Sequence, residues 1–149
     1  MITSILLVLA LVAQVTDAYT AFVTGAKGYL GSALVKELQQ CEKCSSIIVA
    51  SRKPAPGTDK VCFDMEDIDS VRRSIESTRP DVIFHLAGAF SSCEPEEVEE
   101  KIVRPNVIGT ENVMNAAKEF GVNHVVLASS MAAVRGGKQE PKDGEVRLD

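Results

Sequence analysis

Three glycines lie in one short stretch of the chain, Thr24-Gly25-Ala26-Lys27-Gly28-Tyr29-Leu30-Gly31, between an apolar run and an amphipathic helical pattern. Their spacing predicts separate roles. Gly25 permits a tight turn, Gly28 lets backbone amides approach an anion, and Gly31 lets the helix pack closely against the strand. The N-terminus of that helix would add N–H groups and a partial positive charge. We therefore expect the turn to bind the diphosphate of a dinucleotide; the alternative is a glycine-rich turn without a ligand.

The end of the second expected strand bears on which dinucleotide fits. At this place, about 20 residues after the glycine turn, a carboxylate would bind a ribose 2′-hydroxyl, whereas an arginine accommodates a 2′-phosphate. The chain has Arg52 and Lys53 here and no carboxylate. The planar donor fork of arginine suits a phosphate. The sequence thus favours NADP, with NAD possible, and the alternative interpretation is two solvated loop cations.

The glycine turn opens a regular alternation of short apolar runs with helical patterns. Such an alternation predicts right-handed βαβ units, and so an α/β doubly wound parallel sheet in the order 3-2-1-4-5. Asp64 or Asp67 is expected to cap the second helix, and Pro105 to interrupt or kink a later one because proline has no N–H. Strands are expected at 19–24, 46–50, 61–63, 81–86 and 125–128, and helices at 29–40, around 68–75 and at 106–120.

Four motifs, in order, resemble the extended branch of the short-chain dehydrogenase/reductase superfamily, the NAD(P)-dependent epimerase/dehydratase group. They are the Gly-x-x-Gly-x-x-Gly turn, Asp81-Val-Ile-Phe-His-Leu-Ala-Gly88, Asn106-Val-Ile-Gly-Thr-Glu-Asn112, and the segment 125–134 with Ser129-Ser130. The last segment is most similar to the cinnamoyl-CoA reductase and dihydroflavonol reductase type. The resemblance covers residues 19–149 and implies a Rossmann-type, NAD(P)-binding domain of an oxidoreductase.

The resemblance also implies roles for individual residues. The Ser130 hydroxyl would hold the substrate oxygen, and Asn106 would help to organise the catalytic site. Ordinary turn chemistry for the serine pair, and helix capping by Asn106 or Asp64, are the competing interpretations. His85 is expected to be structural. The implied cofactor contacts are Gly25, Ala26, Gly28, Tyr29, Leu30, Gly31, Arg52, Lys53, Asp64, Met65, Leu86, Ala87, Gly88 and Ser129.

The family's proton donor, a Tyr-x-x-x-Lys pair, does not occur in these 149 residues. Tyr19 and Tyr29 are the two tyrosines, and neither is followed by Lys four residues later. We expect residues 19–149 to be the cofactor-binding part of a C-terminally truncated reductase that lacks its substrate-binding part, binds NADP weakly and turns over no carbonyl compound. The alternatives are a dinucleotide-sensing module without catalysis, a sugar-nucleotide epimerase or dehydratase, and a sterol dehydrogenase.

The composition and the N-terminus bear on partners and location. With 16 Lys and Arg against 21 Asp and Glu, the chain has a net charge of -5, which argues against a nucleic-acid binder. The apolar run at 5–13 is shorter than the roughly 20 residues of a membrane-spanning helix. Residues 1–18 are expected to be a secretory signal peptide or an uncleaved anchor. A signal would direct the protein to the endoplasmic reticulum; otherwise we expect a cytoplasmic protein.

Four cysteines, Cys41, Cys44, Cys62 and Cys93, complete the set of reactive residues. The Cys-Glu-Lys-Cys spacing is that of a redox pair or of half a zinc site. No second Cys or His pair follows at metal-ligand spacing, so no metal site is predicted. Four cysteines allow three disulfide pairings, and the preferred interpretation is four unpaired thiols.

Overall fold

The computed structural model of the chain describes residues 18–52, 60–90 and 93–130. In this part, five strands form one parallel sheet in the order β3-β2-β1-β4-β5. The predicted α/β class and strand order are confirmed. Lys53 and the segment 1–17 of the expected signal or anchor lie outside the described residues. The strands are β1 (Tyr19–Thr24), β2 (Cys44–Ser51), β3 (Lys60–Cys62), β4 (Val82–His85) and β5 (His124–Leu127).

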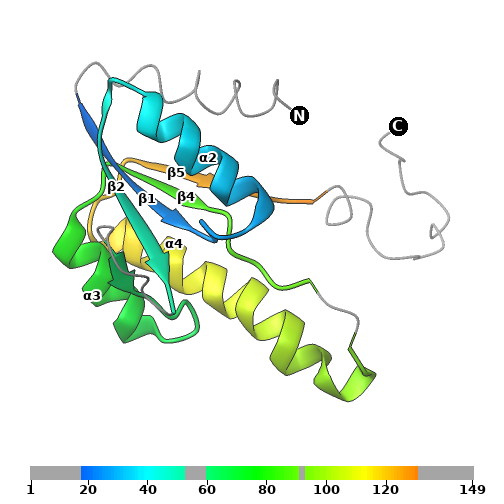
Figure 1. Cartoon of the computed structure of the whole chain (residues 1–149). Helices are drawn as coiled ribbons and strands as arrows, with labels where there is room; N and C mark the ends of the chain where they lie inside the picture. The colour runs from blue at the N-terminus through cyan, green and yellow to red at the C-terminus, as the bar shows by residue number, and fades with distance from the viewer. Residues whose placement is uncertain (1–17, 53–59, 91–92, 131–149) are drawn as a thin grey trace, which may run out of the picture.

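Helices cover both faces of the sheet (Figure 1). Helix α2 (Tyr29–Gln40) packs on one face, where Leu34 and Leu38 meet the buried side chains of β1 and β4. Helices α3 (Ile68–Thr78) and α4 (Gly109–Glu119) pack on the other face. Because β1 and β4 are apolar on both sides, they fill both cores, as expected of central parallel strands.

The ends of α3 follow from its flanking residues. The Asp67 carboxylate accepts a hydrogen bond from the Asp69 N–H at 3.0 Å and so caps the helix. Arg79 ends it in the left-handed conformation, with φ at 44°, and its N–H donates to the Ile75 carbonyl. Of the two expected capping residues, Asp67 holds the position and Asp64 does not.

Pro105 does not end its helix, so the prediction of a helix beginning at Asn106 is wrong. Helical backbone runs without a gap from the segment η2 (Glu99–Ile108) into α4. The turns of η2 are wide, with the Gly109 N–H donating to the Arg104 carbonyl five residues earlier. A wider turn relieves the clash between the proline ring and the preceding turn, which a normal α-helix cannot do. A short 3₁₀ turn, η1 (Pro95–Glu97), precedes this helix.

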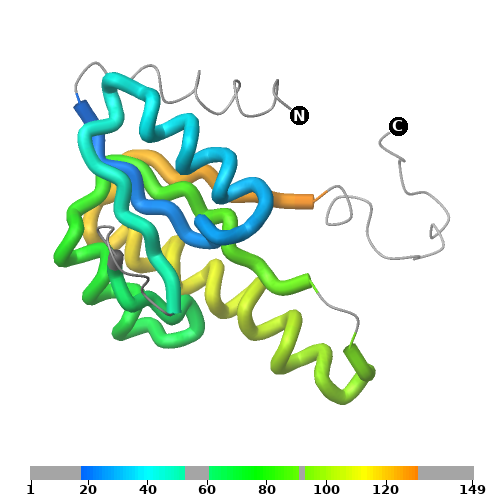
Figure 2. The backbone as a smooth tube through the Cα atoms, in the orientation of Figure 1, coloured from blue at the N-terminus to red at the C-terminus, as the bar shows by residue number. Residues whose placement is uncertain are grey.

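The chain path brings distant segments together at one edge. In Figure 2 the backbone of β4 lies alongside that of β1, and the two pair from Ala21 with Val82 to Thr24 with His85. Because all strands run the same way, their carboxyl ends share this edge.

Within the described ranges, no helix has the length and apolar character needed to cross a membrane.

Candidate functional site: the carboxyl edge of the sheet

The sheet register collects the residues selected from the sequence at the carboxyl edge. Thr24 pairs with Ala50 on one side and with His85 on the other. Ser51 pairs with Cys62, and His85 with Leu127. The residues that follow these strand ends therefore lie at one edge: the glycine turn after β1, Arg52 after β2, Asp64 and Met65 after β3, Leu86 to Gly88 after β4, and Ser129 and Ser130 after β5.

The glycine turn is held by contacts that admit no side chain at two of its glycines. Gly25 has φ of 68°, and a Cβ there would lie 2.6 Å from the Ala87 nitrogen. A Cβ on Gly31 would lie 2.2 Å from the Gly25 carbonyl oxygen. The Gly28 N–H donates to that same oxygen at 2.9 Å and closes the turn. These contacts give Gly25 and Gly31 the turn and packing roles predicted from their spacing.

Gly28 differs from the other two glycines because a side chain there would be tight against one atom without overlapping it. A Cβ on Gly28 would lie 3.2 Å from the Gly25 carbonyl oxygen, and apart from its chain neighbours no other atom lies within 4 Å. Gly28 is the N-cap of α2, so no side chain caps this end, and the first turn of the helix carries no acidic residue. Tyr29 and Leu30 are 77% and 45% exposed. This helix N-terminus is accessible and electropositive, which is the environment that binds phosphate groups.

A buried polar network fixes the loop after β4. The Thr24 hydroxyl oxygen accepts hydrogen bonds from the Leu86 and Ala87 N–H groups at 3.2 and 3.1 Å. With both lone pairs in use, its proton points to His85 Nδ1, 2.8 Å away. His85 Nε2 then carries the ring proton and donates to Thr110 Oγ1 at 3.1 Å.

His85 is therefore a neutral, structural histidine, as predicted. Its ring is fully buried, and burial lowers its pKa below the usual value. The network joins β1, β4 and α4 directly beneath the glycine turn. Thr24 was missed in the sequence, although the available signal was a hydroxyl group immediately before Gly25, after the apolar residues 21–23 of the strand.

Asn106 lies against the same loop. Its Oδ1 accepts from the Ala89 N–H at 2.7 Å, and its Nδ2 donates to the Ala89 carbonyl at 2.8 Å. A Cβ on Gly88 would lie 3.1 Å from Asn106 Oδ1. The side chain thus ties η2 to the segment after β4. Capping, the competing interpretation from the sequence, is wrong because Asn106 lies inside continuous helical backbone.

The segment after β3 is held on the other side of the turn. The Asp64 carboxylate accepts from the Glu66 N–H at 3.1 Å. Met65 packs against Gly109, and its carbonyl accepts from Asn112 Nδ2 at 2.9 Å. Asp64 itself is exposed at the sheet edge, so its carboxylate shapes the turn and still faces solvent.

The remaining selected residues are exposed at the same edge. Arg52 follows β2, and its carbonyl oxygen lies 3.8 Å from the Cys62 thiol. Ser129 and Ser130 are exposed after β5, where the Ala128 N–H donates to the His85 carbonyl at 3.0 Å. In the described part of the chain, no three His, Cys, Asp or Glu side chains gather in a way that would hold a metal ion.

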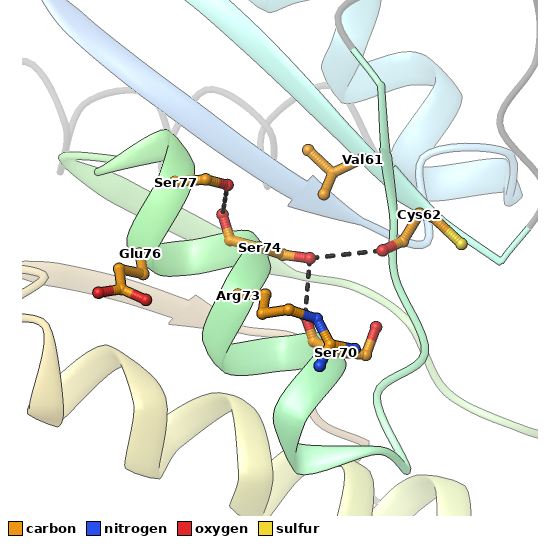
Figure 3. A pocket seen from close by; sticks show the side chains of 7 residues that line it. All are labelled: Val61, Cys62, Ser70, Arg73, Ser74, Glu76 and Ser77. Atoms are coloured by element: carbon orange, nitrogen blue, oxygen red, sulfur yellow. Dashed lines mark hydrogen bonds between the residues drawn. The ribbon is translucent and has the colours of Figure 1, made fainter.

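An open hollow of about 650 Å³ lies elsewhere, between β3 and α3 (Figure 3). Its most buried polar group is the Ser74 hydroxyl, which lies 2.8 Å from the Ser70 carbonyl and 3.4 Å from the Cys62 carbonyl. None of the residues selected for cofactor chemistry lines it. It is lined by Val61, Cys62, Ser70, Arg73, Ser74, Glu76 and Ser77.

Comparison with known proteins agrees with this geometry. The model of the NAD dependent epimerase/dehydratase family matches residues 21–148. The chain belongs to this family. The match includes the glycine turn and all the strand ends that form the carboxyl edge, so the family relationship covers the whole candidate site.

Individual relatives are longer than this chain. Cinnamoyl-CoA reductase 1 of Petunia hybrida is 36% identical over 126 residues, which cover 75% of this chain and 35% of the relative. The uronate dehydrogenase structure from Agrobacterium tumefaciens is 30% identical with a TM-score of 0.59, covering 74% of this chain and 40% of that one. The UDP-glucose 4-epimerase of Thermus thermophilus, solved with NAD, is similar in fold, with a TM-score of 0.65, 24% identity, and coverage of 87% and 42%. The chain spans about a third of the length of the curated relatives it matches.

Proposed function

We propose that this chain is the dinucleotide-binding part of an NADP-dependent oxidoreductase of the extended short-chain type, acting on a carbonyl or hydroxyl group. The observation that carries the proposal is the glycine turn. Gly25 and Gly31 are packed against backbone, whereas Gly28 is the N-cap at the N-terminus of α2, where no side chain makes a capping hydrogen bond. A diphosphate placed there meets N–H groups and the positive end of the helix dipole.

The residues around the turn fit the rest of a dinucleotide. The Leu86 and Ala87 N–H groups are held by Thr24, so this loop would contact the ligand through its other atoms. Asp64 and Met65, which follow β3, are proposed to contact the adenine, as the family resemblance implies. A bound nicotinamide would supply or accept hydride, and the protein's part is then to orient the substrate and handle its proton.

NADP is favoured over NAD on the chemistry of one position. Arg52 is exposed after β2, at the level of the glycine turn in the sheet register. A guanidinium there matches a 2′-phosphate and gives no acceptor for a ribose 2′-hydroxyl. Lys53 is proposed to act with it.

Ser130 and Asn106 are the proposed catalytic-site residues. Ser130 lies just beyond the carboxyl end of β5, the place where open α/β sheets bind ligands, and its hydroxyl would hold the substrate oxygen. Asn106 is a positioning residue, because its side chain fixes the segment after β4 through both hydrogen bonds to Ala89.

A second candidate is a dinucleotide-binding module without catalysis. It is favoured by the tyrosines: Tyr19 is buried in β1, and Tyr29 begins α2 on the glycine turn. Neither has a lysine four residues later. Both candidates predict that these 149 residues bind a dinucleotide and reduce no carbonyl substrate. They differ in whether a longer chain that contains this domain and a Tyr-x-x-x-Lys pair has reductase activity.

Calorimetric titration of the 149-residue chain with NADPH and with NADH tests the proposal. We expect tighter binding of NADPH. Hydrogen bonds to charged groups contribute about 1.5–3 kcal/mol, so Arg52→Gln should lower the affinity for NADPH by about tenfold or more and leave the affinity for NADH unchanged. Lys36→Gln, at an exposed position of α2, is the control, because it removes one positive charge as Arg52→Gln does. If NADPH and NADH bound with equal affinity, and Arg52→Gln changed neither affinity, the NADP preference would be rejected. If neither dinucleotide bound, the proposal itself would be rejected.

A further inference from the structure

Two cysteines lie in one turn at the opposite edge of the sheet from the candidate site. Cys41 is the C-cap of α2, and Cys44 is the first residue of β2. The Cys44 N–H donates to the Cys41 carbonyl at 2.9 Å, which makes the four residues a closed turn. Such a turn brings its first and last Cα atoms within about 7 Å, and disulfides span Cα distances of about 4.4–6.8 Å. A closed turn of this kind is therefore compatible with a disulfide between its first and last residues.

The turn is fixed to the first residue of β1. The Tyr19 N–H donates to the Lys43 carbonyl at 2.8 Å, and the Tyr19 hydroxyl lies 3.8 Å from Cys41 Sγ. Tyr19 is 2% exposed, and burial, together with the neighbouring Cys41 and Cys44, raises the pKa of its phenol. Both cysteines therefore neighbour the buried Tyr19: Cys41 through its sulfur, and Cys44 as the residue paired with Tyr19 in the sheet register.

We propose that Cys41 and Cys44 form a reversible dithiol–disulfide pair that exchanges with small-molecule disulfides. All four cysteines of the chain are free thiols in the structure, which is the reduced form of the pair. The proposal rests on the closed turn and on the neighbouring Tyr19. It does not depend on dinucleotide binding.

The two thiols differ in a way that assigns their roles. Burial acts to raise the pKa of Cys41. It is outweighed by hydrogen bonds from the Lys43 and Cys44 N–H groups and the Tyr19 hydroxyl, together with the Lys43 charge, so the pKa of Cys41 lies below its usual value. Burial, and then the charge of Cys41, raise the pKa of Cys44. Cys41 is accordingly the attacking thiolate and Cys44 the resolving thiol.

The exchange proceeds in two balanced steps. The Cys41 thiolate attacks one sulfur of the small disulfide, breaks its S–S bond and releases the first small thiolate, leaving a mixed disulfide on Cys41. Cys44 loses its proton to solvent, attacks Cys41 Sγ and releases the second small thiolate. The two protein thiols lose two electrons, and the small disulfide gains them.

Trapping the thiols of the intact 149-residue chain tests this directly. The reduced protein is equilibrated in mixtures of reduced and oxidised glutathione, alkylated and digested with trypsin, which cuts after Lys36, Lys43 and Arg52. Because one cut falls between the two cysteines, the disulfide form yields residues 37–43 joined to residues 44–52. We expect this linked species to grow as the mixture becomes oxidising, while Cys62 and Cys93 stay open to alkylation.

Variants and a spectroscopic signal supply the controls. The chain has no Trp and two Tyr, so its emission comes from Tyr19, beside the pair, and from Tyr29, at the other end of α2, and a change on oxidation of the pair is expected from Tyr19. Oxidation should change this emission in the wild type and in a variant with Cys62→Ser and Cys93→Ser, but not in one with Cys41→Ser and Cys44→Ser. Independent alkylation of Cys41 and Cys44 at every glutathione ratio, or linkage of either to Cys62, Cys93 or another chain, would overturn the proposal.

Discussion

Replacing Gly28 and Gly31 by alanine separates ligand binding from folding within one turn. A Cβ on Gly31 would lie 2.2 Å from the Gly25 oxygen and 2.7 Å from the Ala26 Cα, both backbone atoms that cannot move without opening the turn. Overpacking of this kind costs about 1–3 kcal/mol or more, and alanine regains about 1 kcal/mol of helix propensity. Because a 2.2 Å approach to backbone puts this overlap at the upper end of the range or above it, we expect Gly31→Ala to lower the free energy of unfolding by about 2 kcal/mol.

Gly28→Ala should act on binding instead. Gly28 has φ of -72° and ψ of 171°, which alanine adopts freely, and its Cβ would meet one atom, at 3.2 Å. The loss of stability should stay within about 1 kcal/mol, the usual cost of alanine at an N-cap. Its methyl group, however, would stand at the uncapped N-terminus of α2, where the diphosphate is proposed to bind. We expect dinucleotide affinity to fall by more than about tenfold, or 1.4 kcal/mol.

Urea unfolding followed by circular dichroism, and calorimetric titration with NADP, measure the two effects. Gly121→Ala is the matched control, because Gly121 has φ of 70° with nothing within 4 Å of its Cβ position. It should cost about 1–2 kcal/mol of stability and leave affinity unchanged. A Gly28→Ala variant that binds as the wild type does, or a Gly31→Ala variant as stable as the wild type, would refute this account of the turn.

Two further predictions concern the residues beneath the turn. His85 has a pKa below its usual value in the folded state, so at mildly acidic pH the unfolded state binds more protons than the folded state. The free energy of unfolding should therefore be highest above about pH 6.5 and fall as the pH drops toward the pKa of the folded state. His85→Gln should remove this dependence from urea titrations between about pH 6.5 and 5, and an unchanged slope would disprove it. Asn106→Leu leaves the Ala89 N–H and carbonyl without their partner, and should cost about 1–3 kcal/mol and speed amide exchange at Ala89. Unaltered exchange there would contradict the positioning role.

The elements of the fold were predictable wherever the local pattern and the packing agree. The glycine turn and α2 follow their sequence pattern, and the alternation of apolar runs implied the parallel sheet and its order. The bounds of the strands moved by one or two residues, as for β2, which begins at Cys44, because pairing with β1 extends it beyond its apolar stretch.

What the sequence did not reveal depends on long-range partners. Pro105 stays within a helix because η2 adopts wide turns, a choice that local propensity does not encode. Asn106 bonds to Ala89, which is 17 residues away in the sequence, so its role was indistinguishable from capping before the fold was known. Thr24 was overlooked because its hydrogen bonds reach Leu86 and Ala87 on another strand end.

The proposed function requires that the glycine turn bind the diphosphate of a dinucleotide. Titration of the ¹⁵N-labelled chain with NADP, followed through the backbone amide shifts, measures this binding residue by residue. We predict that the largest shifts fall on the amides of Gly28, Tyr29, Leu30 and Gly31, at the N-terminus of α2. Shifts centred instead on the hollow between β3 and α3, or none at saturating ligand, would contradict the account.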